Sequence, residues 1–134
     1  MSEQADPTPA NIFLLMGGEE RVRALVDRFY DLMDLEPAYR ALRVVHGSDL
    51  AQARQKLFWF LCGWLGGPNH YIERFGHPRL RARHMPFKIG LAERDQWLAC
   101  MDQAMGELGV EQALRAKLRE AFFGTADWMR NTPG

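Results

Sequence analysis

The segment from residue 76 to residue 90 holds the side chains best suited to chemistry. It contains two of the four histidines and three arginines, at positions 79, 81 and 83. Its two prolines exclude a long regular helix, because proline lacks the amide hydrogen that helical pairing needs. The sequence on either side is typical of amphipathic helices. A histidine on a short irregular segment between helices can point into a cavity and bind a metal or cofactor, and His84 is our candidate for that role.

Zinc binding is only weakly indicated. Zinc normally takes three or four Cys, His or carboxylate ligands in a recognisable spacing. His70, His77 and His84 recur at intervals of seven on a segment that cannot be one continuous helix, and Cys62 stands apart. The sequence also has no glycine-rich phosphate loop and no serine in a nucleophile-elbow motif. It therefore does not indicate hydrolase chemistry.

One common cofactor, haem, needs only a single histidine from the protein on one side of its iron. It also needs a flat apolar slot and basic groups near its anionic edge. The slot could be formed by Leu57, Phe60, Leu61, Phe87 and Ile89, and the edge could be met by Arg83, Arg81 and Lys56. From the residues alone, the alternative of a core histidine beside a solvated arginine cluster stays open.

Periodic apolar residues predict the helices that would enclose this segment. The clearest stripe has i, i+3, i+4, i+7 spacing and comprises Val22, Leu25, Val26, Phe29, Tyr30 and Met33. The other predicted helices span residues 11–16, 49–65, 91–108 and 111–130, with a short helical turn at 38–42. The segment 69–90 is irregular apart from turns near Tyr71 and His84, and loops of that length are usually functional. Because no strand pattern of period two occurs, the predicted fold class is all-α.

Composition places the chain among ordinary soluble proteins. Of its 134 residues, 47% are apolar and 25% are charged, and the formal net charge is zero. That balance does not attract nucleic acid or an anionic membrane, and no apolar run is long enough to span a bilayer. Two cysteines in apolar helical patterns are too few for a disulfide framework, which favours a reducing cytoplasm. We expect residues 1–10 to be a flexible tail and residues 11–134 to form one domain.

Several motifs together closely resemble the group II truncated haemoglobins of bacteria. They are Phe29-Tyr30, the run from Leu61 to Pro68, Gly76-His77-Pro78, the run from Leu80 to Phe87, and Trp97. The run Leu-Arg-Ala-Arg-His-x-Pro-Phe at residues 80–87 is highly specific for that group. The similarity extends in order from Asn11 to the final helix. The pairs Gly17-Gly18 and Gly66-Gly67 also resemble the two interhelical glycine motifs of truncated globins.

The resemblance implies a truncated globin-like two-over-two helical sandwich. Its main helices would be those around Phe29, Phe60, Trp97 and Phe122. It also implies a b-type haem (iron protoporphyrin IX), held without covalent attachment and with His84 as the proximal ligand to the iron. The absence of a CxxCH attachment motif agrees with that expectation.

On the distal side, the resemblance implies ligand-stabilising roles for Tyr30 and Trp97. Many relatives carry phenylalanine or tyrosine where this chain has His46, and Ala53 stands where vertebrate globins carry a distal histidine. Hydroxyl, indole and imidazole N–H donors would stabilise the partial negative charge on a dioxygen ligand. The alternatives from the residues alone are core packing for Tyr30 and Trp97, and a partly exposed loop position for His46.

The resemblance also implies which residues would contact the propionates at the haem edge and which would cover the haem faces. Lys56 and Arg83 match positions that pair with propionates, and Tyr71 is a candidate for a further hydrogen bond. The faces of the haem would be covered by Leu57, Phe60, Leu61, Phe87, Ile89 and Met101. Arg79 and Arg81 could equally be solvated surface charges.

We therefore expect a pentacoordinate-capable b-type haem that binds dioxygen, NO and CO reversibly. Three polar distal groups favour slow release of dioxygen, which suits redox chemistry or sensing better than bulk transport. The possible roles are delivery or scavenging of oxygen and chemistry on NO or peroxide. Whether the chain is an enzyme, such as an NO dioxygenase or peroxidase-like protein, stays open, as does a reductase partner and a monomeric or weakly dimeric state. The alternative is a cofactor-free helical interaction module that binds an anionic partner through the segment Arg79–Arg83.

Overall fold

Helices account for all the regular secondary structure found in the described part of the chain. The computed structural model describes residues 9–47, 50–77, 79, 82, 84, 85 and 87–132. The elements are α1 (Pro9–Met16), α2 (Gly18–Leu35), the 3-10 turn η2 (Pro37–Tyr39), α3 (Arg40–Val45), α4 (Ala51–Trp64), α5 (His70–Phe75), α7 (Leu91–Glu107) and α8 (Gln112–Trp128). The described residues include no strand, and the prediction of an all-α fold is confirmed.

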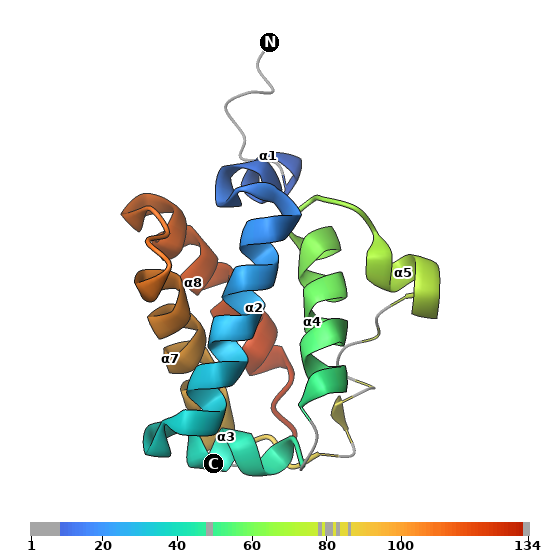
Figure 1. The fold of residues 1–134 in the computed structure, drawn as a ribbon. Coiled ribbons are helices and arrows are strands. Elements are labelled where there is room, and N and C mark those ends of the chain that lie inside the picture. The colour runs from blue at the N-terminus through green and yellow to red at the C-terminus, as the bar shows by residue number, and fades with distance from the viewer. Residues whose placement is uncertain are drawn as a thin grey trace.

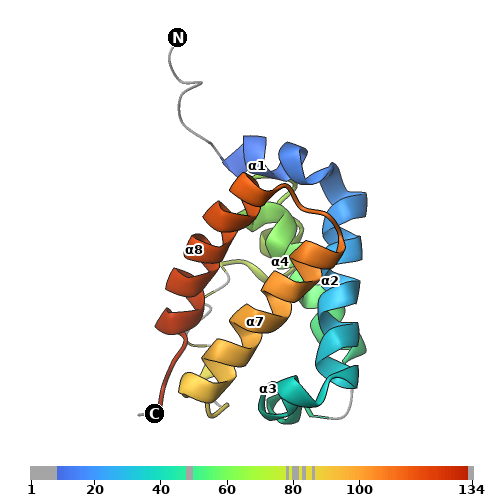
Figure 2. The same cartoon turned by 90° about the vertical axis from the view of Figure 1, so that its left-hand side faces the viewer.

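The four longest helices form two antiparallel pairs. Figures 1 and 2 show α2 running beside α4 and α7 running beside α8 in opposite directions. The α2 helix also packs against α7, so it contacts both pairs. Its predicted apolar stripe is buried, from Val22 at 0% exposure to Tyr30 at 4%. A helix that packs on two neighbours needs such a wide apolar face.

The corner formed by η2 and α3 is fastened to α7 by two glutamine side chains. The Tyr39 hydroxyl donates to Gln103 Oε1 at 2.6 Å, and the Leu42 amide donates to Gln96 Oε1 at 3.0 Å. These bonds hold the first half of α3 against α7, and His46 follows directly after the last residue of that helix. The predicted turn at 38–42 was too short, because packing on α7 carries helical structure as far as Val45.

The segment before α7 contains more regular structure than its composition suggests. The predicted turn near Tyr71 is the helix α5, which packs against α4. Around His84, the Met85 amide donates to Ala82 O at 3.3 Å and the Phe87 amide donates to His84 O at 3.0 Å, so the turn predicted there is present. Across the described ranges, no helix is both long and apolar enough to cross a membrane.

The helix α1 packs against the residues that follow α4, and Gly67 lies at the point of contact. The Phe13 amide donates to Leu65 O at 3.0 Å, which places the Phe13 ring over Gly67. A Cβ at Gly67 would lie 2.6 Å from two carbons of that ring. Glycine is therefore required here for close approach of the two segments rather than for an unusual backbone angle.

Replacing Gly67 by alanine is expected to lower the free energy of unfolding by about 1–3 kcal/mol, because the added carbon overpacks the site. Urea unfolding of the variant and the wild type measures this loss. In a Phe13→Leu background the aromatic ring is gone, and the penalty of the alanine should shrink. An equal penalty in both backgrounds would show that the ring contact is not its cause.

Candidate functional site

Three of the side chains expected near a bound ligand gather where α2, α3 and α7 meet. The ring centroids of Tyr30 and His46 lie 5.7 Å apart in an edge-to-face arrangement. The ring of Phe29 lies 5.0 Å from Tyr30 and 5.3 Å from Trp97, so it bridges the two. The structure therefore brings Tyr30, His46 and Trp97 into one aromatic cluster.

Tyr30 is a buried residue whose hydroxyl has no hydrogen-bond partner among the described residues. The residue is 4% exposed, and since no fully buried side-chain N or O atom in the described ranges lacks a partner, the hydroxyl faces accessible space. Burial raises the pKa of Tyr30 well above its ordinary value, although the positive charge of Arg54 opposes the shift. The phenol is therefore protonated at neutral pH and can donate to a ligand beside it.

Arg54 holds α4 against the part of α2 that carries Tyr30. Its guanidinium donates to Asp27 O at 3.1 Å, to Asp27 Oδ1 at 3.2 Å and to Asp31 Oδ1 at 2.7 Å. The two aspartates lie one helical turn apart on α2, on either side of Tyr30 in the sequence. The guanidinium carbon lies 5.8 Å from the centre of the Tyr30 ring, which explains its effect on that hydroxyl.

His46 has one ring nitrogen occupied by the backbone. Its Nδ1 lies 2.9 Å from Leu42 O, and because a carbonyl oxygen can only accept, Nδ1 carries the proton. In the neutral ring Nε2 is then an acceptor. The donor role expected of His46 therefore requires either a protonated ring or loss of the Leu42 bond. Burial lowers the pKa of His46, with the Leu42 bond opposing and Arg43 adding to the shift, so the neutral ring is favoured.

The stability of the chain should fall in acid partly because of His46. Its folded-state pKa lies below the ordinary value of about 6.5, so at acid pH the unfolded chain takes up this proton more readily than the folded one. The free energy of unfolding is then lost as pH falls below that value. We expect His46→Phe to lose less stability than the wild type in urea unfolding between about pH 8 and about pH 5. An equal loss of unfolding free energy in the two proteins would show that protonation of His46 is not one of its causes.

Trp97 is half-buried, with the aromatic cluster on one side and α8 on the other. Its ring lies 5.3 Å from that of Phe122, which in turn stacks on Trp64 at 4.9 Å with nearly parallel planes. This row of aromatic rings connects α7, α8 and α4. Contacts on both sides restrict the indole, and its N–H can only donate.

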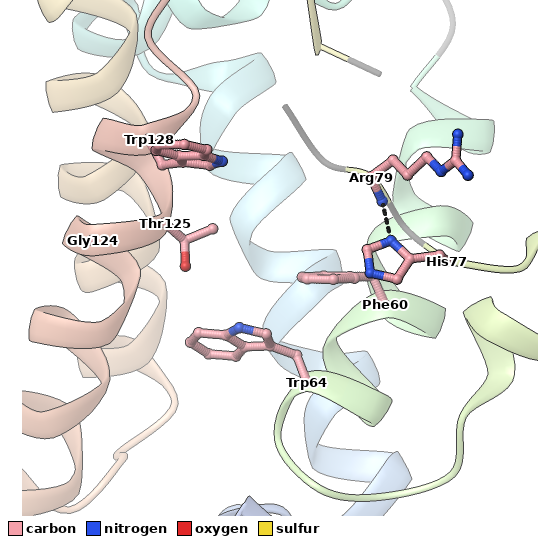
Figure 3. A pocket seen from close by; sticks show the side chains of 7 residues that line it. All are labelled: Phe60, Trp64, His77, Arg79, Gly124, Thr125 and Trp128. Carbon is pink, nitrogen blue, oxygen red and sulfur yellow. Dashed lines mark hydrogen bonds between the residues drawn. The ribbon is translucent and has the colours of Figure 1, made fainter. Parts of the chain in front are cut away.

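A cavity of about 550 Å³ opens between α4 and α8, and its size lies in the range of cofactor and ligand sites. Figure 3 shows α8 on one side and α4 on the other, with the segment after α5 at the rim. Its lining consists of Phe60, Trp64, His77, Arg79, Gly124, Thr125 and Trp128. At the rim, His77 Nδ1 accepts a hydrogen bond from the Arg79 amide at 3.1 Å.

Most of this lining was not predicted as haem-contacting. Phe60 is the one lining residue that was also expected to contact haem, whereas Trp64 and the three residues from α8 were not. The available signal was the pair Gly124-Thr125, two small residues that leave space beside an otherwise bulky helix. Arg79 has a left-handed backbone, with φ at 46°, and is exposed at the rim.

The other expected contacts lie on several elements around α4. Leu61 and Met101 are both 1% exposed and belong to the core, and Ile89 is 9% exposed. Leu57 is half-buried and packs on the same core. Tyr71 is buried with its ring 6.2 Å from Phe60, and Lys56 is exposed with Nζ 5.6 Å from the Phe75 ring centre. Arg83 and Arg81 lie outside the described residues.

His84 is half-buried on the segment that precedes α7. The ring of Phe87 lies 6.5 Å away, and Phe87 itself is 45% exposed. Nowhere in the described ranges do three His, Cys, Asp or Glu side chains come together as a metal site. A metal bound by His84 would therefore need most of its ligands from another group, as iron receives from a porphyrin.

Comparison with known proteins identifies relatives along almost the whole chain. Residues 11–131 match the family model described as bacterial-like globin. The group 2 truncated hemoglobin YjbI of Bacillus subtilis (strain 168) is 43% identical over 107 residues, which cover 80% of this chain and 76% of that protein.

Solved structures agree in sequence and fold. The group II 2-on-2 hemoglobin of Agrobacterium tumefaciens is 41% identical, with a TM-score of 0.88 and coverage of 92% of this chain and 95% of that one. The truncated oxygen-avid haemoglobin of Bacillus subtilis is 42% identical, with a TM-score of 0.78 and coverage of 85% and 94%. The chain therefore belongs to the bacterial-like globin family and, within it, to the group II truncated haemoglobins.

Proposed function

We propose that this chain holds a b-type haem on His84 and stabilises a dioxygen ligand with the donors of Tyr30 and Trp97. Membership of the globin family carries the coarser part of that statement, a haem cofactor and a diatomic gas as ligand. When bound, the haem would supply a ferrous iron that can bind a diatomic gas. The residues of the chain account for the rest.

The observation that carries the proposal is the Tyr30 hydroxyl, which has no hydrogen-bond partner in the described ranges although the residue is only 4% exposed. Because no fully buried side-chain N or O atom in those ranges lacks a partner, this hydroxyl faces accessible space beside the aromatic rings, where it can donate to a ligand. Trp97 reaches the same cluster through Phe29 and adds a second donor. Both donors suit a ligand that carries partial negative charge.

The neighbours of the two donors keep water from competing with the ligand. Phe29 is fully buried between Tyr30 and Trp97, and Met101 and Leu61, each 1% exposed, belong to the same hydrophobic core. In such an apolar surrounding a hydrogen bond is stronger than in water. At the anionic edge, Lys56, Tyr71 and Arg83 would bind the propionates, while Leu57, Phe60, Phe87 and Ile89 would pack on the ring.

Slow release of dioxygen is the finer part of the proposal. Two fixed donors raise the cost of dissociation, and a relative of 42% identity is described as oxygen-avid. A ligand that leaves slowly suits scavenging, or redox chemistry on NO or peroxide, better than bulk transport. We place this activity in the cytoplasm, where the two free, buried cysteines would stay reduced and a reductase would return the iron to the ferrous state. The chain would act as a monomer or weak homodimer.

Optical spectra of the ferric, ferrous and gas-exposed protein test the proposal directly. The purified chain should be red, or should become red with added hemin, and show a strong Soret band that shifts with dioxygen and carbon monoxide. A colourless protein that takes up no hemin would contradict the proposal. It would instead favour a cofactor-free module that binds an anionic partner through residues 79–83.

A further inference from the structure

The chain beyond α8 returns to the segment that carries His84. Figure 2 shows it running down from α8 to the level at which α7 begins. At this point the Asn131 amide donates to Ile89 O at 2.9 Å, and the Thr132 amide donates to the same oxygen at 3.3 Å. Two backbone hydrogen bonds therefore join the end of the described chain to the residues just after His84.

The side chain of Asn131 adds three more hydrogen bonds to the same segment. Its Nδ2 donates to Phe87 O at 2.7 Å and to His84 O at 3.3 Å, and its Oδ1 accepts from the Ile89 amide at 2.9 Å. A carboxamide offers two N–H donors and one carbonyl acceptor, and all three are used here. Asn131 therefore contacts the backbone at both ends of the turn that begins at His84.

The local sequence cannot supply these partners by itself. The proline at position 86 has no amide hydrogen, and no regular helix continues from the turn into α7, which begins at Leu91. Within the turn, the Phe87 amide donates to the His84 carbonyl at 3.0 Å. Asn131 adds a bond to that oxygen from a distant part of the chain, and so restricts the backbone from which the imidazole projects.

We infer that Asn131 is a positioning residue for the haem-binding histidine. By holding the carbonyls of His84 and Phe87 and the amide of Ile89, it sets the position and tilt of the His84 ring. The inference rests on the proposed function, because it concerns the same site. Residues that orient a metal ligand through hydrogen bonds typically raise the affinity for the bound metal by about 10–100-fold.

Two substitutions of Asn131 distinguish the donor bonds of its side chain from the acceptor bond. Asn131→Ala removes all three side-chain bonds. Asn131→Asp has nearly the same shape and keeps an acceptor for the Ile89 amide, but it loses both donors and places a carboxylate against two carbonyl oxygens. The matched control is Thr132→Val, since Thr132 bonds to this segment through its backbone amide, which valine retains.

Three measurements on the full chain test the inference. They are the rate of hemin transfer to an excess of an acceptor apoprotein, the iron–histidine stretching band of the ferrous protein by resonance Raman, and amide hydrogen exchange of His84, Phe87 and Ile89 in the hemin-free chain. Both Asn131 variants should lose hemin at least about tenfold faster and shift or broaden the iron–histidine band. The Ile89 amide should exchange faster in Asn131→Ala but stay protected in Asn131→Asp. Thr132→Val should match the wild type in all three.

The possible failures can be told apart. If the wild type takes up hemin but both Asn131 variants keep its transfer rate and its iron–histidine band, the inference is overturned, whatever happens to their melting temperature. Asn131 would then be a structural link only. If the wild type takes up no hemin, the proposed function fails and this inference fails with it. Unchanged exchange at Ile89 in Asn131→Ala also overturns the inference, and this result does not depend on hemin.

Discussion

Replacing His84 by alanine is expected to release hemin faster by orders of magnitude and to abolish the normal ferrous spectrum. The change removes the one protein ligand that the proposed haem iron would have, and apolar packing alone would then retain the cofactor. Hemin transfer to an acceptor apoprotein and the Soret spectrum measure the two effects. Added imidazole should fill the space left by the side chain and restore much of the wild-type spectrum.

The matched control for that experiment is His70→Gln. His70 lies on the short helix α5, where its Nε2 is 2.8 Å from a carboxylate oxygen of Glu19, and it has no assigned role toward the cofactor. This variant should retain hemin as the wild type does. Normal retention by His84→Ala, or equal loss from the two variants, would show that His84 is not the ligand.

Replacing Tyr30 or Trp97 by phenylalanine is expected to speed dioxygen dissociation by about 10–100-fold. A hydrogen bond to a group that carries charge contributes about 1.5–3 kcal/mol, and about 1.4 kcal/mol corresponds to a factor of ten. Each substitution removes a donor but keeps an aromatic ring, so the contacts with Phe29 and Phe122 remain. Stopped-flow dissociation of dioxygen measures the effect.

These variants also separate ligand stabilisation from simple core packing. The Tyr30 hydroxyl has no hydrogen bond to lose within the described ranges, so Tyr30→Phe should leave the free energy of unfolding of the hemin-free chain nearly unchanged. Carbon monoxide carries less charge when bound than dioxygen, and its dissociation should change less. Unchanged dioxygen rates in both single variants and in the double variant would leave only a packing role for the two side chains.

The long helices were predictable because their signal is local. A stripe of apolar residues at helical spacing needs only a neighbour to cover it. The helix α2 contains its predicted stripe, and α4, α7 and α8 follow their predicted bounds within a few residues. The short helices were less predictable, since a helix of six residues is stable only through its contacts. For this reason α3 extends beyond its predicted end and α5 replaces an expected turn.

The aromatic cluster at Tyr30 was predictable as a set of residues but not in its chemistry. The types and order of Tyr30, His46 and Trp97 pointed to a family, and the fold brings them into one cluster. The proton on His46 is decided by the Leu42 carbonyl, which turns an expected donor into an acceptor when the ring is neutral. That outcome depends on how α3 ends, which the residue pattern does not specify.

The sequence by itself determined the all-helical class, the stripes that form the core, the family, and the choice of His84 as the candidate ligand. Each of these depends on residue types or on spacings within one segment. Three features became visible only in the tertiary structure. They are the cavity between α4 and α8, the hydrogen bonds from Arg54 to α2, and the hydrogen bonds from Asn131 to the His84 segment. These features join side chains from separate elements, and a polar group can take many partners until packing brings one of them within reach.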